Sequence, residues 1–297
     1  METNLTFPSG ALTLDATLSA PDAAQRSPAA LLISGSGPLD RDSNTKRLRV
    51  DVMRQVARHL AGNGIASLRY DKRGVGESQG DYMSAGFFDN VADARAALAA
   101  LRSRPEVDAD KVVVVGHSEG ALIASVLAAD DGLAAGEDIA GVVLLAGPAR
   151  TGKEVLLWQA RQIAPTLPKP VRWIMKVLRQ DVLRTQAKRL ERIESSTEDV
   201  IRVQLVKLNA KWFREFMAFD PLRTLSRATV PVLAITGAKD IQVDSGDVAV
   251  MKQIVPTAFV GHVVTDLTHL LRTEPDAPSL RTYKLSLIHI SEPTRLQ

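Results

Sequence analysis

Short apolar runs alternate with helical apolar patterns along most of this sequence. Residues 29–33 form an apolar run that enters a glycine-rich turn, and Val52, Met53, Val56 and Leu60 then recur at helical spacing. Further strand-like runs lie at 65–70, 112–115, 139–146, 230–236 and 258–264. Such alternation is typical of an α/β fold with a mostly parallel, doubly wound sheet, and we expect the later runs to be buried strands.

Two segments depart from this alternation. Residues 4–7 and 11–19 are short alternating stretches on either side of Pro8-Ser9-Gly10, which predicts a hairpin at the start of the fold. Residues 151–217 have long helical stretches, little strand signal and all three tryptophans. We therefore predict a helical cap over 151–217, inserted into a core formed by 1–150 and 218–284.

Charge and composition exclude several classes of protein. The 297 residues carry a formal charge of +3, which is too small for a dedicated nucleic-acid binder, and 45% hydrophobic residues suffice for a full core. The predicted cap holds 14 basic against 7 acidic residues. We interpret this excess as solvated helix faces, with a lid that attracts anionic substrates or a membrane surface as the alternative.

Cysteine is absent, which excludes disulfides, thiol nucleophiles and cysteine-ligated metals. The five histidines do not fall at close metal-ligand spacing, so we expect no metal and no other cofactor. The N-terminal stretch has no basic start followed by an apolar run, and no segment approaches the roughly 18 apolar residues of a membrane span. We expect a cytoplasmic protein with a small-molecule partner; the oligomeric state stays open.

The clearest chemical motif is Gly116-His117-Ser118-Glu119-Gly120, which matches G-x-S-x-G between the 112–115 run and a helix expected from Ala121. In a strand-turn-helix setting this motif lifts the serine hydroxyl to the carboxyl end of the sheet, and the helix N-terminus favours a developing oxyanion. We predict Ser118 as a nucleophile. A glycine-flanked turn serine without chemistry is the alternative.

A serine hydroxyl needs a histidine base and an acid that holds this base. The acid belongs after a late strand, where Asp240 follows the 230–236 run, with Asp244 and Asp247 as alternatives. The predicted base is His269, which follows the last strand-like run. The remaining histidines are less well placed: His59 lies on a helix, His117 precedes the turn apex, His262 lies inside a strand and His289 belongs to the tail.

An oxyanion hole needs two backbone N–H groups. Glu119, directly after Ser118, is predicted to supply one, and Ser36 the other, because the glycines on either side of Ser36 let the chain approach a substrate closely. The predicted substrate-binding residues are Gly35, Gly37, Trp158 and Trp212. For the two tryptophans, burial within the cap is the favoured role and substrate contact is the alternative.

At these residues the sequence resembles the α/β-hydrolase superfamily from Asn4 to about Arg272. Residues 35–42 (GSGPLDRD) and 70–78 (YDKRGVGES) resemble its bacterial carboxylesterase and serine-aminopeptidase-like branch. The resemblance implies an α/β-hydrolase fold with Ser118, Asp240 and His269 as the catalytic triad. Two departures are Ser34-Gly35 in place of the usual His-Gly, and no apolar period after Leu271 that could form a final helix.

The charged residues of these two stretches are interpreted as a structural network beneath the pocket. They are Asp40, Arg41, Asp42, Asp71 and Arg73. A direct substrate role for Arg41 or Arg73 is the alternative.

The sequence therefore predicts a serine hydrolase that cleaves carboxylic esters through an acyl-enzyme. An ester is preferred because no acidic clamp for a free amino terminus is recognisable. An aminopeptidase or amidase of the same fold is the first alternative, and a non-catalytic protein that binds small ligands is the second. Residues 285–297 include a stretch that resembles a translated sequencing adapter, so we expect this tail to be foreign to the natural protein.

Overall fold

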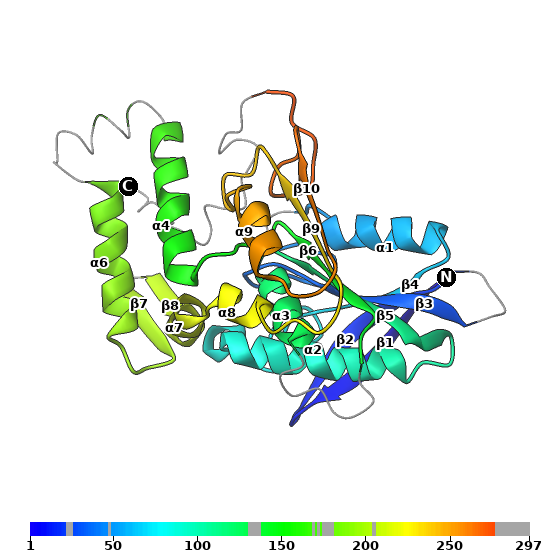
Figure 1. Cartoon of the computed structure of the whole chain (residues 1–297). Helices are drawn as coiled ribbons and strands as arrows, with labels where there is room; N and C mark the ends of the chain where they lie inside the picture. Colours follow the sequence, from blue (N-terminus) through cyan, green and yellow to red (C-terminus); the bar gives the residue numbers. More distant parts are fainter. Residues whose placement is uncertain are drawn as a thin grey trace.

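An eight-stranded sheet with the order β1-β2-β4-β3-β5-β6-β9-β10 forms the centre of the protein (Figure 1). The computed structural model describes residues 1–21, 26–46, 49–129, 138–167, 170, 173, 181–203 and 206–276. The strands are β1 Glu2–Ser9, β2 Leu12–Ser19, β3 Ser27–Ile33, β4 Ala66–Tyr70, β5 Val107–His117, β6 Gly141–Leu145, β9 Val232–Gly237 and β10 Phe259–Val264.

Strand directions follow the predicted pattern. The β1–β2 hairpin is antiparallel and joins β4 in antiparallel pairing, whereas every pair from β4 to β10 is parallel. The run of four valines lies in β5, between β3 and β6 in the middle of the sheet. The mostly parallel sheet and the N-terminal hairpin are therefore confirmed.

Helices cover both faces of the sheet. Alternate side chains of β3 lie on opposite faces of the sheet. Ala30 and Leu32 pack with Met53 of α1 (Val52–Gly62), while Leu31 and Ile33 pack with the helices of the other face. The helices of this second face are α2 Phe87–Arg102, α3 Glu119–Ala128 and α9 Asp247–Ile254. Figure 1 shows α1 on one side of the sheet and α2 and α3 on the other.

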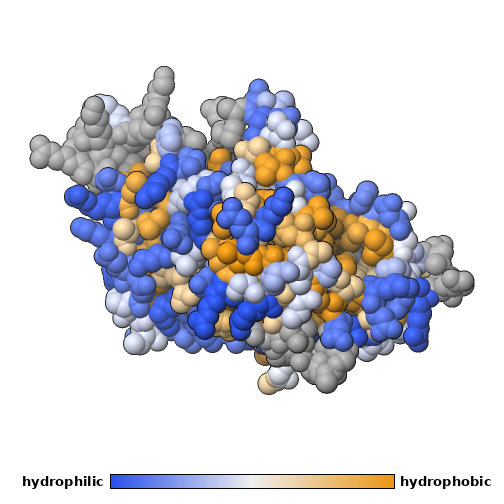
Figure 2. Space-filling model, viewed as in Figure 1, coloured by the Kyte–Doolittle hydropathy of each residue, from blue (hydrophilic) through white to orange (hydrophobic). Residues whose placement is uncertain are grey.

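Strand β10 corrects one expectation, because it is exposed and not buried. Only Phe259 is half-buried, and the residues after it are exposed. The physical reason is position: β10 is the edge strand of the described sheet, paired with β9 alone, so its apolar run lacks the cover that central strands have. Figure 2 shows apolar surface around the neighbouring helix α9, where Val250 and Ile254 are exposed.

Between β6 and β9 the chain leaves the sheet. It forms α4 Gly152–Ile163, the short helix η2 Ala164–Thr166, α6 Val182–Glu194, β7 Val200–Val203, β8 Val206–Asn209 and α7 Ala210–Ala218. Helix α4 packs on α6 and α7, to the left of the sheet in Figure 1. The antiparallel pair β7–β8 is not predicted by the sequence, because four-residue strands leave little alternation to recognise.

The chain returns to the sheet through α8 Pro221–Leu225, which packs on α3 and α9. The boundaries of a cap at 151–217 stay a prediction. Residues 285–297, including His289, lie outside the described residues. Among the helices that the structure describes, none combines the length and apolar composition that a membrane span requires.

Candidate active site

Ser118 lies at the sharp turn between β5 and α3, with φ 57° and ψ −114°. A residue other than glycine rarely adopts positive φ, so the surrounding structure must hold it there. The N–H of Ser118 donates to the carbonyl of Leu145 at 2.9 Å. A Cβ atom at Gly116 would collide with the carbonyl of Gly120, and one at Gly120 with that of Ile33. Both glycines are therefore required for the strand, the turn and the helix to come this close.

Asp240 and His269 are in direct contact. Nδ1 of His269 lies 2.8 Å from Oδ2 of Asp240, and both side chains are buried. The other oxygen of Asp240 accepts the backbone N–H groups of Gln242 at 2.7 Å and Val243 at 2.9 Å. A carboxylate held in this way requires the proton on Nδ1, because it can only accept, and this leaves Nε2 as the acceptor nitrogen of neutral His269.

The two alternative acids are bound elsewhere. Arg150 donates to Asp244 at 2.5 Å and to Asp247 at 3.0 Å, and Asp247 also accepts the backbone N–H of Ala149. These contacts favour Asp240 as the acid that belongs with His269.

His117 connects the Ser118 turn to the loop that carries His269. Nε2 of His117 lies 2.7 Å from the carbonyl oxygen of His269, and the two rings are 4.9 Å apart between centroids. Burial, together with the neighbouring His269 ring, lowers the pKa of His117 to about 3, so its ring is neutral near pH 7. Since a carbonyl only accepts, Nε2 of His117 carries the hydrogen and donates it. His59 and His262 are exposed.

Ser118 lines a small cavity of about 40 Å³ together with Ser36 and Glu119. Its apolar wall comes from Val155 and Leu156 of α4 and from three aromatic residues of α7: Trp212, Phe213 and Phe216. The Trp212 ring stacks on Phe216 with centroids 4.7 Å apart. The structure thus brings an apolar wall from outside the sheet up to the predicted nucleophile.

The glycines of the loop after β3 lie close to Ser118. A Cβ atom built on Gly35 would be 3.3 Å from the Cβ of Ser118, so any side chain there would crowd the turn. Gly37 has φ 104°, a region that side-chain-bearing residues rarely adopt. Trp158 is not brought to this cavity: it lines a different one with Arg150 and Arg161, because it projects from another face of α4 than Leu156.

The carboxylate of Glu119 is the centre of a buried polar cluster that the sequence analysis missed. One oxygen accepts Nζ of Lys72 at 2.7 Å; the other accepts Nε1 of Trp212 at 2.7 Å and Nδ2 of Asn90 at 3.0 Å. Lys72 also donates to the carbonyl oxygen of Gly35 at 2.6 Å. A signal was present, since Asn90 occupies the apolar face of α2 and a polar residue there requires a buried partner.

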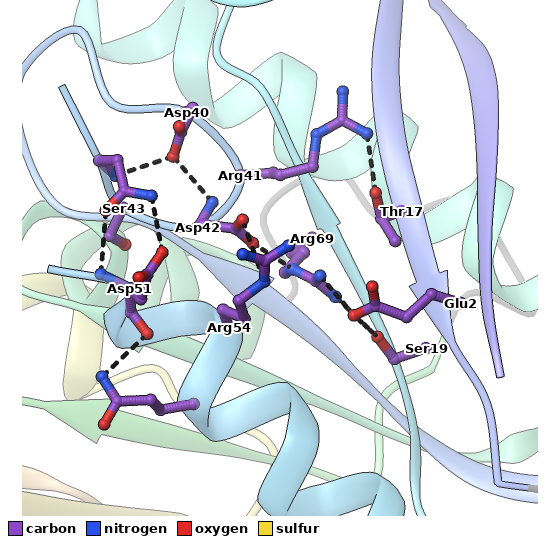
Figure 3. A network of polar contacts seen from close by, with 12 residues as sticks. Glu2, Thr17, Ser19, Asp40, Arg41, Asp42, Ser43, Asp51, Arg54 and Arg69 are labelled. Carbon is purple, nitrogen blue, oxygen red and sulfur yellow. Dashed lines mark hydrogen bonds and ion pairs between the residues drawn. The ribbon is translucent and has the colours of Figure 1, made fainter. Parts of the chain in front are cut away.

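Charged residues of the loop after β3, which carries Ser36, bind to side chains of the neighbouring strands (Figure 3). Arg41 donates to Thr17 at 2.8 Å and pairs with Asp71 at 2.7 Å, and it also contacts Asp15. One residue further, Asp42 accepts Nε of the fully buried Arg69 at 2.6 Å. These contacts tie the loop to β2 and β4, as a structural network would.

Arg73 is held in the same manner. Its Nε and Nη2 atoms donate to the two oxygens of Asp93, each at 2.7 Å, and Nη1 lies 3.2 Å from Asp89. Neither Arg41 nor Arg73 lines the cavity beside Ser118. Their contacts therefore favour a structural role over direct contact with substrate. In the described part of the chain, no group of three or more histidine, aspartate or glutamate side chains is placed to hold a metal ion.

Comparison with known sequences identifies what this chain is similar to. Residues 49–276 match the family described as serine aminopeptidase, S33. Esterase EstD of Thermotoga maritima is 29% identical over 247 residues, which are 82% of this chain and 54% of the relative. The chain thus spans about half the length of this curated relative. Both matches confirm the predicted branch of the α/β-hydrolase superfamily.

Solved structures are similar over nearly the whole chain. Est1E from Butyrivibrio proteoclasticus, with bound ferulic acid, has a TM-score of 0.64 at 18% identity and covers 90% of this chain and 91% of its own. The α/β hydrolase GrgF from Penicillium sp. sh18 has a TM-score of 0.62 at 16% identity and covers 97% and 98%. At such identities the likeness establishes the fold alone, and the predicted α/β-hydrolase fold is confirmed.

Proposed function

Since this chain belongs to the serine aminopeptidase S33 family, we propose that it is a serine hydrolase that cleaves small carboxylic esters through an acyl-enzyme. The observation that carries the proposal is the 2.8 Å contact between Nδ1 of His269 and Oδ2 of Asp240. The loop of His269 contacts His117, the residue before the strained Ser118. An aspartate on Nδ1 fixes the imidazole tautomer that can accept a hydroxyl proton on Nε2.

In the first step Oγ of Ser118 forms a bond with the acyl carbon while Nε2 of His269 takes the hydroxyl proton. The carbonyl oxygen, on which negative charge develops, accepts hydrogen bonds from the backbone N–H groups of Ser36 and Glu119. The alcohol leaves with the proton from His269. Water then gives a proton to His269 and bonds to the acyl carbon. The bond from this carbon to Oγ of Ser118 breaks, His269 returns the proton to Oγ, and the acid leaves.

The cavity supports a short acyl group. A cavity must have a volume of at least about 10–15 Å³ to hold one water molecule. The cavity of about 40 Å³ therefore admits a group of roughly two or three heavy atoms beyond the carbonyl. The wall from Leu156 and Phe216 is apolar, which suits an alkyl chain. In this proposal residues 151–217 act as a cap, with Trp212 but not Trp158 at the acyl site.

An ester is favoured over an aminoacyl substrate. A free amino terminus is positively charged and needs a carboxylate that can still accept its hydrogens. Glu119 is the acidic residue of the cavity wall, and its oxygens already accept from Lys72, Asn90 and Trp212. The aminopeptidase alternative is supported by the description of the matching family. Binding without chemistry is disfavoured by the strain at Ser118.

The test compares p-nitrophenyl acetate, propionate, butyrate and octanoate with the p-nitroanilides of alanine and proline. Wild type should give a burst of one p-nitrophenol per active site with the short esters, and Ser118→Ala should give none. Faster turnover of an anilide than of any ester would establish the aminopeptidase alternative. A wild type that turns over none of these compounds would favour the non-catalytic alternative.

A further inference from the structure

Lys72 and Glu119 form a buried ion pair, and Glu119 is one of the two residues of the proposed oxyanion hole. Nζ of Lys72 lies 2.7 Å from Oε2 of Glu119, and their side chains are 5% and 1% exposed. Each residue of the pair touches one of the two loops that meet at Ser118. Glu119 is part of the turn itself, and Lys72, which follows β4, reaches the loop after β3.

The second contact of Lys72 determines the direction of the Ser36 N–H group. Nζ of Lys72 donates to the carbonyl oxygen of Gly35 at 2.6 Å. This carbonyl and the N–H of Ser36 belong to the same trans peptide group, in which C=O and N–H point in opposite directions. An ammonium group that holds the oxygen therefore turns the N–H of Ser36 away from Lys72. It also polarises the peptide, which strengthens this N–H as a donor.

The contact between Lys72 and Glu119 holds the other proposed donor, the backbone N–H of Glu119. The backbone N–H that we assign to the oxyanion hole at this position belongs to Glu119 itself, so a fixed Glu119 side chain limits movement of its own peptide. Asn90 and Trp212 use the remaining acceptor positions of the carboxylate. Trp212 also lines the cavity, so the cluster joins the proposed acyl wall to the turn.

Stability alone does not account for such a pair. Transfer of two charges out of water opposes folding by about as much as their attraction favours it, and apolar replacements of both partners are often neutral for stability. We propose that Lys72 and Glu119 are positioning residues that hold the N–H groups of Ser36 and Glu119 at the spacing an oxyanion requires. This role rests on the proposed acyl transfer at Ser118.

The test uses Lys72→Met, Glu119→Gln and the double variant that combines them. Three quantities are measured: the melting temperature, kcat and KM with p-nitrophenyl acetate, and the rate at which a fluorophosphonate labels Ser118. Glu119→Gln keeps an acceptor oxygen for Asn90 and Trp212. Each single variant leaves one buried charge without its opposite charge, so both should melt at lower temperature than wild type.

The double variant separates positioning from charge neutralisation. If the pair positions the donors, the double variant should regain most of the melting temperature and keep KM, while kcat and the labelling rate stay about tenfold or more below wild type. Wild-type labelling and kcat in the double variant would overturn the inference. The control is Asp89→Asn with Lys211→Met, which removes a more exposed 2.8 Å ion pair outside the cavity, together with the contact of Asp89 to Arg73, and should leave all rates unchanged.

A chemical rescue covers the case in which the double variant does not fold. The 297 residues include no cysteine, so Lys72→Cys introduces a unique thiol. Alkylation in denaturant with 2-bromoethylamine restores an ammonium group of lysine length, whereas 1-bromopropane gives a neutral group of the same shape. After refolding, faster labelling of the aminoethylated protein supports the role of the ammonium group. Equal labelling of the two products contradicts it.

Labelling also separates this inference from the ester proposal. A wild type that is labelled at Ser118 but cleaves no ester would refute the ester substrate and leave the labelling test of Lys72 intact. A wild type that is not labelled at Ser118 would overturn both.

Discussion

Nε2 of His117 donates a hydrogen bond to the backbone carbonyl of His269 across 2.7 Å, although 152 residues separate them in the chain. The residue before the proposed nucleophile thereby fixes the loop that carries the proposed base. Nδ1 of His117 is buried and has no hydrogen-bond partner in the part of the chain that the structure describes. This position therefore suits a neutral ring, in which Nδ1 carries no hydrogen. Protonation of His117 would place a charge there.

This arrangement predicts how stability depends on pH. The pKa of His117 is about 3 in the folded protein and 6.5 as its ordinary value, so between these values the unfolded chain binds one more proton. The titration of His117 therefore costs no stability above pH 6.5. Below this pH it lowers the free energy of unfolding by about 1.4 kcal/mol per pH unit.

The measurement is urea unfolding of wild type and His117→Gln between pH 7 and pH 4. The difference in unfolding free energy between the two should shrink as the pH falls, because the variant lacks this titration. His262→Gln, at an exposed position, should keep the wild-type slope. Parallel curves for wild type and His117→Gln would contradict the prediction.

Asp240→Asn should lower kcat with p-nitrophenyl acetate by about 10³- to 10⁴-fold with little change in KM, because an amide can donate to Nδ1 and stabilise the wrong tautomer of His269. Asp244→Asn is the control, since Asp244 is paired with Arg150. The kcat values of the two variants, from steady-state kinetics, decide whether Asp240 or Asp244 is the acid. A larger loss of kcat in Asp244→Asn would identify Asp244 as the acid.

Gly120→Ala should destabilise the protein by about 1–3 kcal/mol and slow fluorophosphonate labelling, because the added methyl group would collide with the backbone of Ile33. Gly62→Ala is the matched control. A Cβ atom at Gly62 meets nothing within 4 Å, and alanine should be neutral or stabilise α1 by up to about 1 kcal/mol. Urea unfolding measures both changes, and equal effects of the two substitutions would refute the steric explanation.

Leu156→Ala should shift the preference among p-nitrophenyl esters from acetate and propionate toward butyrate, because it enlarges the apolar wall of the cavity. Leu157→Ala is the neighbouring control, since Leu157 lines the other cavity of α4. The ratio of kcat/KM for butyrate to that for acetate is the quantity to compare. An unchanged ratio in Leu156→Ala would exclude this cavity as the acyl site.

The sequence predicts features that depend on local order along the chain. The alternation of apolar runs and helical patterns is enough for the parallel sheet, and residues at the ends of strands, such as Ser118 and Asp240, can be selected because parallel strands end at one edge. The exposure of β10 could not be predicted, since an apolar run does not record whether its strand lies at the centre or the edge of a sheet.

Asn90 on the apolar face of α2 indicates that a buried polar partner exists, but the sequence does not tell which residues form the Glu119 cluster. Its partners Lys72, Asn90 and Trp212 come from three separate parts of the chain and meet only after folding. Trp158 lies on α4 and Trp212 on α7, and only the folded arrangement of these helices places the two side chains at different cavities. Contacts between distant residues thus set the limit of prediction from local pattern.

The ion pair of Lys72 and Glu119 has a consequence for how this protein can change. The two positions are 47 residues apart, yet a replacement at either one alone leaves a buried charge unmatched. A mutational library that varies one position at a time would therefore reject nearly every replacement at both sites. Alternative pairs are reachable only when both codons are varied in the same clone.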